Sequence, residues 1–150
     1  MGEAKGFHLP KNKVRKLHAL RIMGSSFGCL VGICLIAFLS AMSSFSFLIP
    51  SFGASCVILF VIPSSAYAQP RSLIGGHLIS SLVGLICYLG LGTTWLSLSL
   101  AVGFAVAVMQ VSRTLHPPAA ADPLFFMMHG GSLSWQTVLL PTMAGSLVLV

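Results

Sequence analysis

Only three charged residues follow Arg21 in this chain of 150 residues, and they are Arg71, Arg113 and Asp122. Charged residues make up 7% of the chain, whereas a soluble domain has about 25%, because its surface faces water. Long stretches without charge predict helices that lie in lipid. We therefore expect an all-α integral membrane protein.

Basic residues are concentrated ahead of the first long apolar stretch. They are Lys5, Lys11, Lys13, Arg15, Lys16 and Arg21. Such a cluster beside a membrane helix favours the cytoplasmic side, where anionic lipid headgroups are its neighbours. We predict a basic cytoplasmic segment over residues 1–20 and a single transmembrane helical domain over residues 21–150. We expect no nucleic-acid partner, because so short a basic segment forms no soluble folded module.

The apolar stretches come in two lengths. The long ones lie over about residues 21–43, 73–92 and 95–112. They come close to or exceed the roughly 20 residues that a helix needs to cross a bilayer. The stretch between Pro50 and Pro63 has only 12 residues, roughly 18 Å of helix. The stretch over residues 124–128 is shorter still, and a last one over residues 135–150 contains Pro141.

The order of long span, short segment, long span occurs twice and predicts two pseudo-repeats, over about residues 21–92 and 95–150. We expect each short segment to be a broken or re-entrant helix. If both cross the bilayer, the repeats are inverted and all basic residues lie inside, as the positive-inside rule expects. If both are re-entrant, four full spans remain, and Arg71 and Arg113 face outward. The charges favour inverted repeats, and the segment lengths favour four spans.

The polar residues of the apolar part gather at the two short segments. Irregular backbone at membrane depth is tolerated only beside protein or a water-filled cavity. Two short, broken segments at corresponding places in the two pseudo-repeats therefore indicate a binding site for a polar solute. Prolines 117 and 118 prevent a regular helix entry. The alanines that follow are predicted to begin a half-helix, whose free N–H groups attract anions. The candidate residues for substrate binding are Ser51, Gly53, Ser55, Arg71, His77, Arg113, His116, Pro117, Pro118 and Asp122.

Several of these candidates also have a plain structural interpretation. Arg71 and Arg113 would set the topology, His116 would bond a backbone carbonyl, and Asp122 would cap a helix. We expect no enzyme, cofactor or metal, because the sequence has no carboxylate pair and no His/Cys cluster with metal-ligand spacing. The cysteines, which are Cys29, Cys34, Cys56 and Cys87, are interpreted as small, buried apolar side chains.

Small residues at a spacing of four predict close helix packing. One such face consists of Gly24, Gly28 and Gly32, and a second consists of Gly76, Ser80 and Gly84. These faces would receive helices of the same chain or of a partner.

Three sequence blocks resemble the HPP family of small integral membrane proteins, which is named for its His-Pro-Pro. They are Ser51-Phe52-Gly53-Ala54-Ser55, Gln69-Pro70-Arg71 with Ile74-Gly75-Gly76-His77, and Arg113-Thr114-Leu115-His116-Pro117-Pro118. Together they cover about residues 45–125. The family often has glycine where Ala120 stands here. The resemblance implies four membrane spans and, from members associated with nitrite transport in cyanobacteria and chloroplasts, a small-anion transporter.

We predict a transporter or channel for a small inorganic anion, nitrite, in the cytoplasmic membrane of a bacterium with the N-terminus inside. His116 would couple a proton, since histidine gains and loses one near neutral pH. A homo-oligomer is expected, because 150 residues leave little room for a pore within one protomer. The alternative is a non-transporting assembly or partner subunit. A dry, packed centre around His116 would favour that alternative, and a polar cavity touching both short segments would favour transport.

Overall fold

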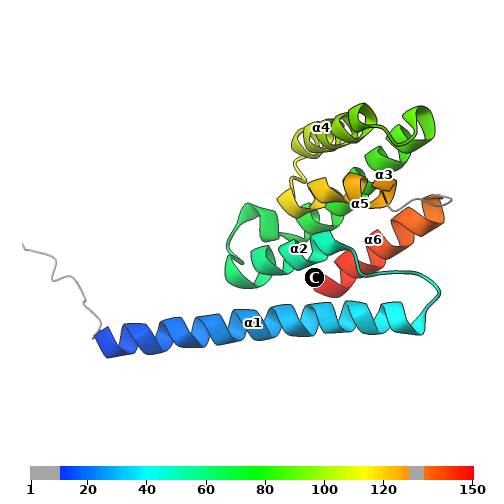
Figure 1. Cartoon of the computed structure of the whole chain (residues 1–150). Coiled ribbons are helices and arrows are strands. Elements are labelled where there is room, and N and C mark those ends of the chain that lie inside the picture. Colours follow the sequence, from blue (N-terminus) through cyan, green and yellow to red (C-terminus); the bar gives the residue numbers. More distant parts are fainter. Residues whose placement is uncertain (1–10, 129–133) are drawn as a thin grey trace, which may run out of the picture.

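The computed structural model describes residues 11–128 and 134–150, and these residues fold into helices without a strand (Figure 1). The α-helices are α1 (Lys11–Met42), α2 (Pro50–Val61), α3 (Pro70–Leu91), α4 (Trp95–Val111), α5 (Asp122–Met128) and α6 (Trp135–Leu149). Two short 3₁₀ helices, η1 (Ala66–Ala68) and η2 (Pro117–Ala121), precede α3 and α5. The expectation of an all-α chain is confirmed for these ranges.

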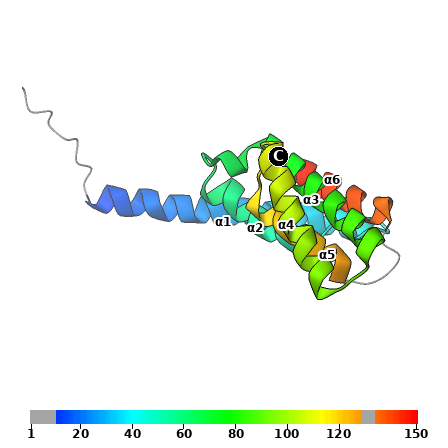
Figure 2. The same cartoon turned by 90° about the horizontal axis from the view of Figure 1, so that it is seen from above.

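Helix α1 begins earlier than the first span was predicted to begin. It starts at Lys11 and runs without a break to Met42, so the predicted boundary at residue 20 falls inside a helix. No proline or glycine interrupts the sequence between Lys11 and Gly24, which allows the basic residues to continue the helix. Its first turns project beyond the other helices (Figures 1 and 2).

Helix α2 is short because prolines bound it. Pro50 occupies the first turn, where a missing N–H costs nothing, and the helix ends at Val61, two residues before Pro63. It lies along α1, and an added Cβ at Gly28 would come within 2.5 Å of the Phe60 ring. Gly28 and Gly32 of the predicted α1 face therefore pack against α2, whereas a Cβ added at Gly24 would have no atom within 4 Å.

Helix α3 is the central element and packs against α4, α5, α6 and η2. Its small-residue face lies against the second broken segment: an added Cβ at Gly76 would meet His116, and one at Gly84 would meet Pro123. This face therefore serves packing within the chain. The predicted span over residues 73–92 agrees with α3 to within a few residues.

The second short segment differs from the half-helix that the sequence predicted. The run after His116 forms the 3₁₀ helix η2, and only then does the seven-residue α5 begin. Pro117 and Pro118 occupy the first turn of η2, where a missing N–H costs nothing. Pro123 lacks the N–H that a regular α-helix would bond to the Ala119 carbonyl, which explains why η2 does not continue as one regular α-helix. Helix α6, in contrast, runs through Pro141 without ending. Residues 129–133, between α5 and α6, lie outside the described residues.

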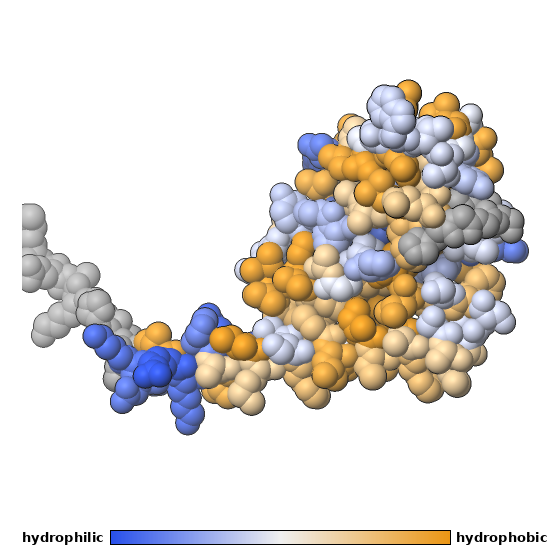
Figure 3. All heavy atoms as spheres, viewed as in Figure 1, coloured by the Kyte–Doolittle hydropathy of each residue, from blue (hydrophilic) through white to orange (hydrophobic). Residues whose placement is uncertain are grey.

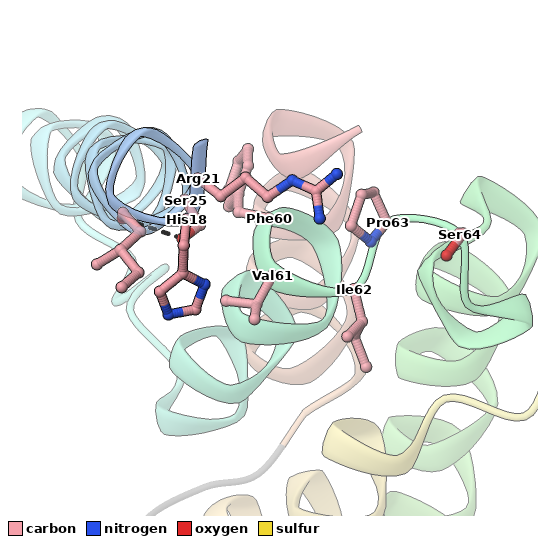
Figure 4. A pocket seen from close by; sticks show the side chains of 9 residues that line it. His18, Arg21, Ser25, Phe60, Val61, Ile62, Pro63 and Ser64 are labelled. Carbon is pink, nitrogen blue, oxygen red and sulfur yellow. Dashed lines mark hydrogen bonds between the residues drawn. The ribbon is translucent and has the colours of Figure 1, made fainter. Parts of the chain in front are cut away.

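Three basic positions gather at one end of the helical bundle, which we call the basic end. The connector after α2 lies beside Arg21, because both line the same pocket (Figure 4). Helix α3 starts from this connector, and the Arg71 side chain donates a hydrogen bond to the Ser112 carbonyl at 2.8 Å. That bond brings the end of α4, with the neighbouring Arg113, to the same end. In Figures 1 and 2, α2 and η2–α5 run between the basic end and the opposite end.

The face of the bundle seen in Figure 3 is largely apolar. Large side chains such as Phe27, Ile86 and Leu89 are more than 60% exposed. Helices α1 and α3 are long and apolar enough to cross a membrane, whereas α2, α4 and α6 are shorter apolar helices. Among the cysteines, Cys56 and Cys87 are buried as expected, but Cys34 is exposed. Such a surface is suited to contact with lipid.

Candidate functional site

Four polar side chains from four different elements meet in the interior, and we call them the core polar network. They are Ser55 of α2, His77 of α3, His116 before η2 and Asp122 at the start of α5. Each of the four is 0% exposed. The network therefore lies where the two short segments pass each other. Helix α3 packs against the second of these segments, and its His77 side chain reaches the first.

The Ser55 hydroxyl is the centre of the network. Its Oγ lies 2.9 Å from Nε2 of His77 and 2.8 Å from Nε2 of His116. The Ser51 carbonyl oxygen lies 3.0 Å from the same hydroxyl oxygen. The Nδ1 of His116 faces the Tyr67 carbonyl at 2.8 Å. A chain of short contacts thus runs from Tyr67 through both imidazole rings.

Asp122 closes the other side of the network. One carboxylate oxygen accepts from the Ser51 hydroxyl at 2.5 Å, and the other lies 2.7 Å from Nδ1 of His77. Ser81 donates to the second oxygen at 3.3 Å and lies 3.0 Å from the Thr142 hydroxyl. The interpretation of Asp122 as a plain helix cap is wrong in this respect, because its carboxylate bonds side chains from α2 and α3.

Local sequence explains why these side chains can approach one another. His116 precedes Pro117 and has an extended backbone (φ −134°, ψ 100°), as residues before proline usually do. Gly76 carries no side chain, and a Cβ there would lie 2.6 Å from the His116 Cβ. The ring centres of His77 and His116 are 5.1 Å apart, and Phe52 covers the other side of His77 at 4.8 Å.

The remaining predicted site residues lie elsewhere. Arg71 and Arg113 are exposed at the basic end, and Gly53 is exposed on α2 with nothing within 4 Å of an added Cβ. Pro117 is exposed, whereas Pro118 is buried in η2. The structure thus brings together Ser51, Ser55, His77, His116 and Asp122 and leaves these five outside the network.

Two polar residues that are hydrogen-bonded to the network were missed by the sequence analysis, and a third buried polar residue was noted only for its size. Ser81 follows His77 by four positions, a spacing that places both on one helix face and that was available from the sequence. Thr142 comes from α6 and gave no such signal. Ser80 was treated as a small packing residue, yet its hydroxyl is buried and, among the described residues, the one buried side-chain polar atom without a hydrogen-bond partner.

The buried Asp122 carboxyl group finds its polar partners within the chain. Asp122 is the single acid in the described part of the chain, and its carboxylate oxygen lies 2.7 Å from Nδ1 of His77, a contact that becomes an ion pair when His77 is protonated. Arg71 and Arg113 do not contact it. A fully buried carboxylate is costly unless it is paired and hydrogen-bonded, so His77 and the serine hydroxyls are its means of compensation.

Comparisons with known proteins identify relatives over most of the chain. A family model described as the HPP transmembrane region matches residues 14–150. One transmembrane protein of Dictyostelium discoideum is 34% identical over 134 residues, which covers 84% of this chain and 47% of the relative. A second one from the same organism is 35% identical over 111 residues, covering 69% of this chain and 35% of the relative. No solved structure gives a significant match.

The chain spans about half, or less, of the length of these curated relatives. Both relatives are described as transmembrane proteins, which agrees with the apolar surface of the bundle. Since both come from Dictyostelium discoideum, the bacterial cytoplasmic membrane stays a prediction.

Proposed function

Because this chain belongs to the HPP transmembrane family and is a membrane protein, we propose that it carries a small inorganic anion, nitrite, across the bilayer. The observation that carries this proposal is the core polar network. Ionisable side chains inside a membrane protein are costly, at about 2.5–3.5 kcal/mol on insertion scales, and usually mark a path for ions or protons. Here they lie where two short segments pass each other, as in transporters with broken helices.

The basic end would collect the anion. Arg71 and Arg113 are exposed there, and Arg21 lies beside the connector that leads to α3. Positive charge around an entrance raises the local concentration of anions. Deeper in the bundle, Ser80 lies on α3 between Gly76 and Gly84, which pack against the second broken segment. Its buried hydroxyl has no hydrogen-bond partner, and we propose that it donates to the passing anion.

The membrane topology that we propose has six crossings with inverted repeats. The segments α2 and η2–α5 both run between the two ends, and Arg21, Arg71 and Arg113 share the basic end. With the N-terminus in the cytoplasm, all three arginines then lie inside, as the positive-inside rule requires. We also propose a homo-oligomer surrounded by lipid, because the core polar network is fully packed within one protomer.

One observation favours the alternative of a non-transporting membrane subunit. The four side chains of the network are completely buried, and their polar atoms are bonded to other protein atoms. A packed centre of this kind needs no solute. Under the transport proposal the same structure is a closed state, in which the network is shielded from both sides of the membrane.

Liposomes that contain the purified chain and a nitrite reporter test the proposal. We expect nitrite entry well above that of empty liposomes, and His116→Ala should lower it severalfold, because two contacts of the network are lost. His18→Ala, which removes an exposed histidine outside the network, is the matched control and should keep the wild-type flux. A folded, reconstituted protein that gives no flux above empty liposomes would support the non-transporting alternative.

A further inference from the structure

Hydrogen atoms in the core polar network can be counted from its contacts. Three groups meet at the Ser55 Oγ: the Ser51 carbonyl, Nε2 of His77 and Nε2 of His116. A hydroxyl donates only one hydrogen bond, and a carbonyl donates none. At least one of the two Nε2 atoms must therefore donate to Ser55.

The other nitrogen of each ring is already used as a donor. Nδ1 of His116 faces the Tyr67 carbonyl, so it carries a hydrogen. Nδ1 of His77 faces the Asp122 carboxylate, and one hydrogen must lie between them. A neutral imidazole has a single N–H. Two neutral rings and an ionised carboxylate are thus at least one hydrogen short of satisfying these contacts. They are one hydrogen short when the Ser55 hydroxyl points to one of the two Nε2 atoms instead of to the Ser51 carbonyl.

We propose that the core polar network holds this additional proton, that the proton moves between His77 and His116 through Ser55, and that the anion crosses together with it. The first two parts concern the network alone, and the third rests on the proposed function. The additional proton is on His77 at rest, because the Asp122 carboxylate stabilises a neighbouring cation. The network then has no net charge.

The transfer needs no other reactant. The His77 Nε2–H proton passes to the Ser55 Oγ while the hydroxyl proton passes to Nε2 of His116. His77 becomes neutral, His116 becomes the imidazolium, and Ser55 is a hydroxyl again. Both transfers follow contacts of 2.8–2.9 Å, and the Tyr67 residue at the His116 end of the chain is 40% exposed. The route therefore leads from Asp122 toward the basic end.

Charge explains why the anion would need the proton. With two neutral histidines, the network carries the single negative charge of Asp122, which repels an anion strongly in a medium of low dielectric constant. With the proton bound, the repulsion is removed. A monovalent anion and a proton cross together without net charge, so transport should follow a pH gradient and respond little to voltage.

Among the described residues around His77, no other ionisable side chain adds or removes a hydrogen in the core polar network. The two that face it are His116, from the start of η2, and Asp122, from α5. The Cys56 thiol on α2 points toward Gly32 of α1. From η1 the contact is a backbone carbonyl, and from α6 it is the Thr142 hydroxyl through Ser81.

Nuclear magnetic resonance of the full chain in detergent tests the proton count without any transport assay. Asp122 is the single aspartate of the sequence, so ¹³C-aspartate labelling gives one carboxyl signal. ¹⁵N-histidine labelling, assigned with single histidine variants, reports the hydrogens on each ring. At pH 7 we expect one imidazolium at His77 beside an ionised Asp122. An ionised Asp122 with two neutral rings at pH 7, and likewise a neutral Asp122, would overturn the assignment.

The variant Asp122→Asn is the matched control. Its amide can donate to Nδ1 of His77 and to Ser81 while its oxygen still accepts from Ser51. Every contact of the two rings is then satisfied with both rings neutral, provided that the Ser55 hydroxyl points to His116. We expect the imidazolium signal to disappear at pH 7. An imidazolium that persists in this variant would contradict the count.

Liposomes with internal pH and nitrite reporters test the coupling. We expect about one proton to enter with each nitrite, and a pH gradient to accelerate uptake severalfold. Nitrite entry without proton entry would refute the coupling and leave anion transport intact. The absence of any nitrite entry would refute the coupling together with the proposed function, while the resonance experiment would still decide the proton count.

Discussion

Replacing Asp122 in two ways separates the loss of its charge from the loss of its hydrogen bonds. Alanine at this position leaves the Ser51 hydroxyl and Nδ1 of His77 without their acceptor, and both groups are buried. A buried polar group that loses its partner costs about 1–3 kcal/mol, so we expect Asp122→Ala to lower the free energy of unfolding by about 3 kcal/mol. That corresponds to roughly a hundredfold change in the unfolding equilibrium.

Asparagine has nearly the same shape as aspartate and can satisfy the same partners with neutral rings. We therefore expect Asp122→Asn to remain within about 1 kcal/mol of the wild type, since bonds are exchanged rather than lost. Unfolding by a denaturing detergent in mixed micelles, followed by circular dichroism at neutral pH, compares the three proteins. Equal losses for Ala and Asn would refute the hydrogen-bond reasoning, because the carboxylate charge alone would then account for the stability.

Three further predictions concern other parts of the structure. Gly76→Ala would place a Cβ 2.6 Å from the His116 Cβ and should lower the free energy of unfolding by about 1–3 kcal/mol. Gly103→Ala is the control: its Cβ would have nothing within 4 Å, so the free energy of unfolding should rise by up to about 1 kcal/mol from helix propensity. A smaller loss for Gly76→Ala in unfolding curves would count against the close approach. Ser80→Ala removes a buried hydroxyl without a partner, so stability should hold or rise while nitrite flux falls, and unchanged flux would remove Ser80 from the anion path. Arg113 has a left-handed φ of 57°, which glycine adopts without strain, so Arg113→Gly should keep the stability of the wild type. The loss of its positive charge should slow nitrite entry at low salt. A nitrite flux equal to that of the wild type would exclude this arginine from collecting the anion.

The sequence predicted the helical elements well where length and composition decide them. Proline at the first position set the start of α2, and the limits of α3 and α4 followed from the apolar stretches and the turn between them. The start of α1 was placed too late, because a basic helix that projects beyond the bundle has no apolar pattern to reveal it. The helix type after His116 was also wrong, because Pro123 removes an N–H that a continuous α-helix needs, whereas the prediction considered only the entry at Pro117 and Pro118.

The candidate site was only partly accessible to sequence reasoning. Polar residues in an apolar chain are conspicuous, so His77, His116 and Asp122 were all selected. Arg71 and Arg113 were selected for the same reason, but they lie exposed at the basic end. Polarity marks a residue as unusual in lipid and does not say whether it lies in the centre of the bundle or at its surface.

The sequence by itself determined that this chain is a helical membrane protein with two short, proline-bounded segments, because apolar length and backbone chemistry act locally along the chain. Only the tertiary structure decided that Ser55 meets His116 across 61 positions and that Ser51 meets Asp122 across 71. Those registers depend on how closely backbones can approach, as Gly76 allows beside His116 and Gly145 allows beside Phe52. The hydrogen count of the core polar network exists only once that packing has brought three groups to one hydroxyl.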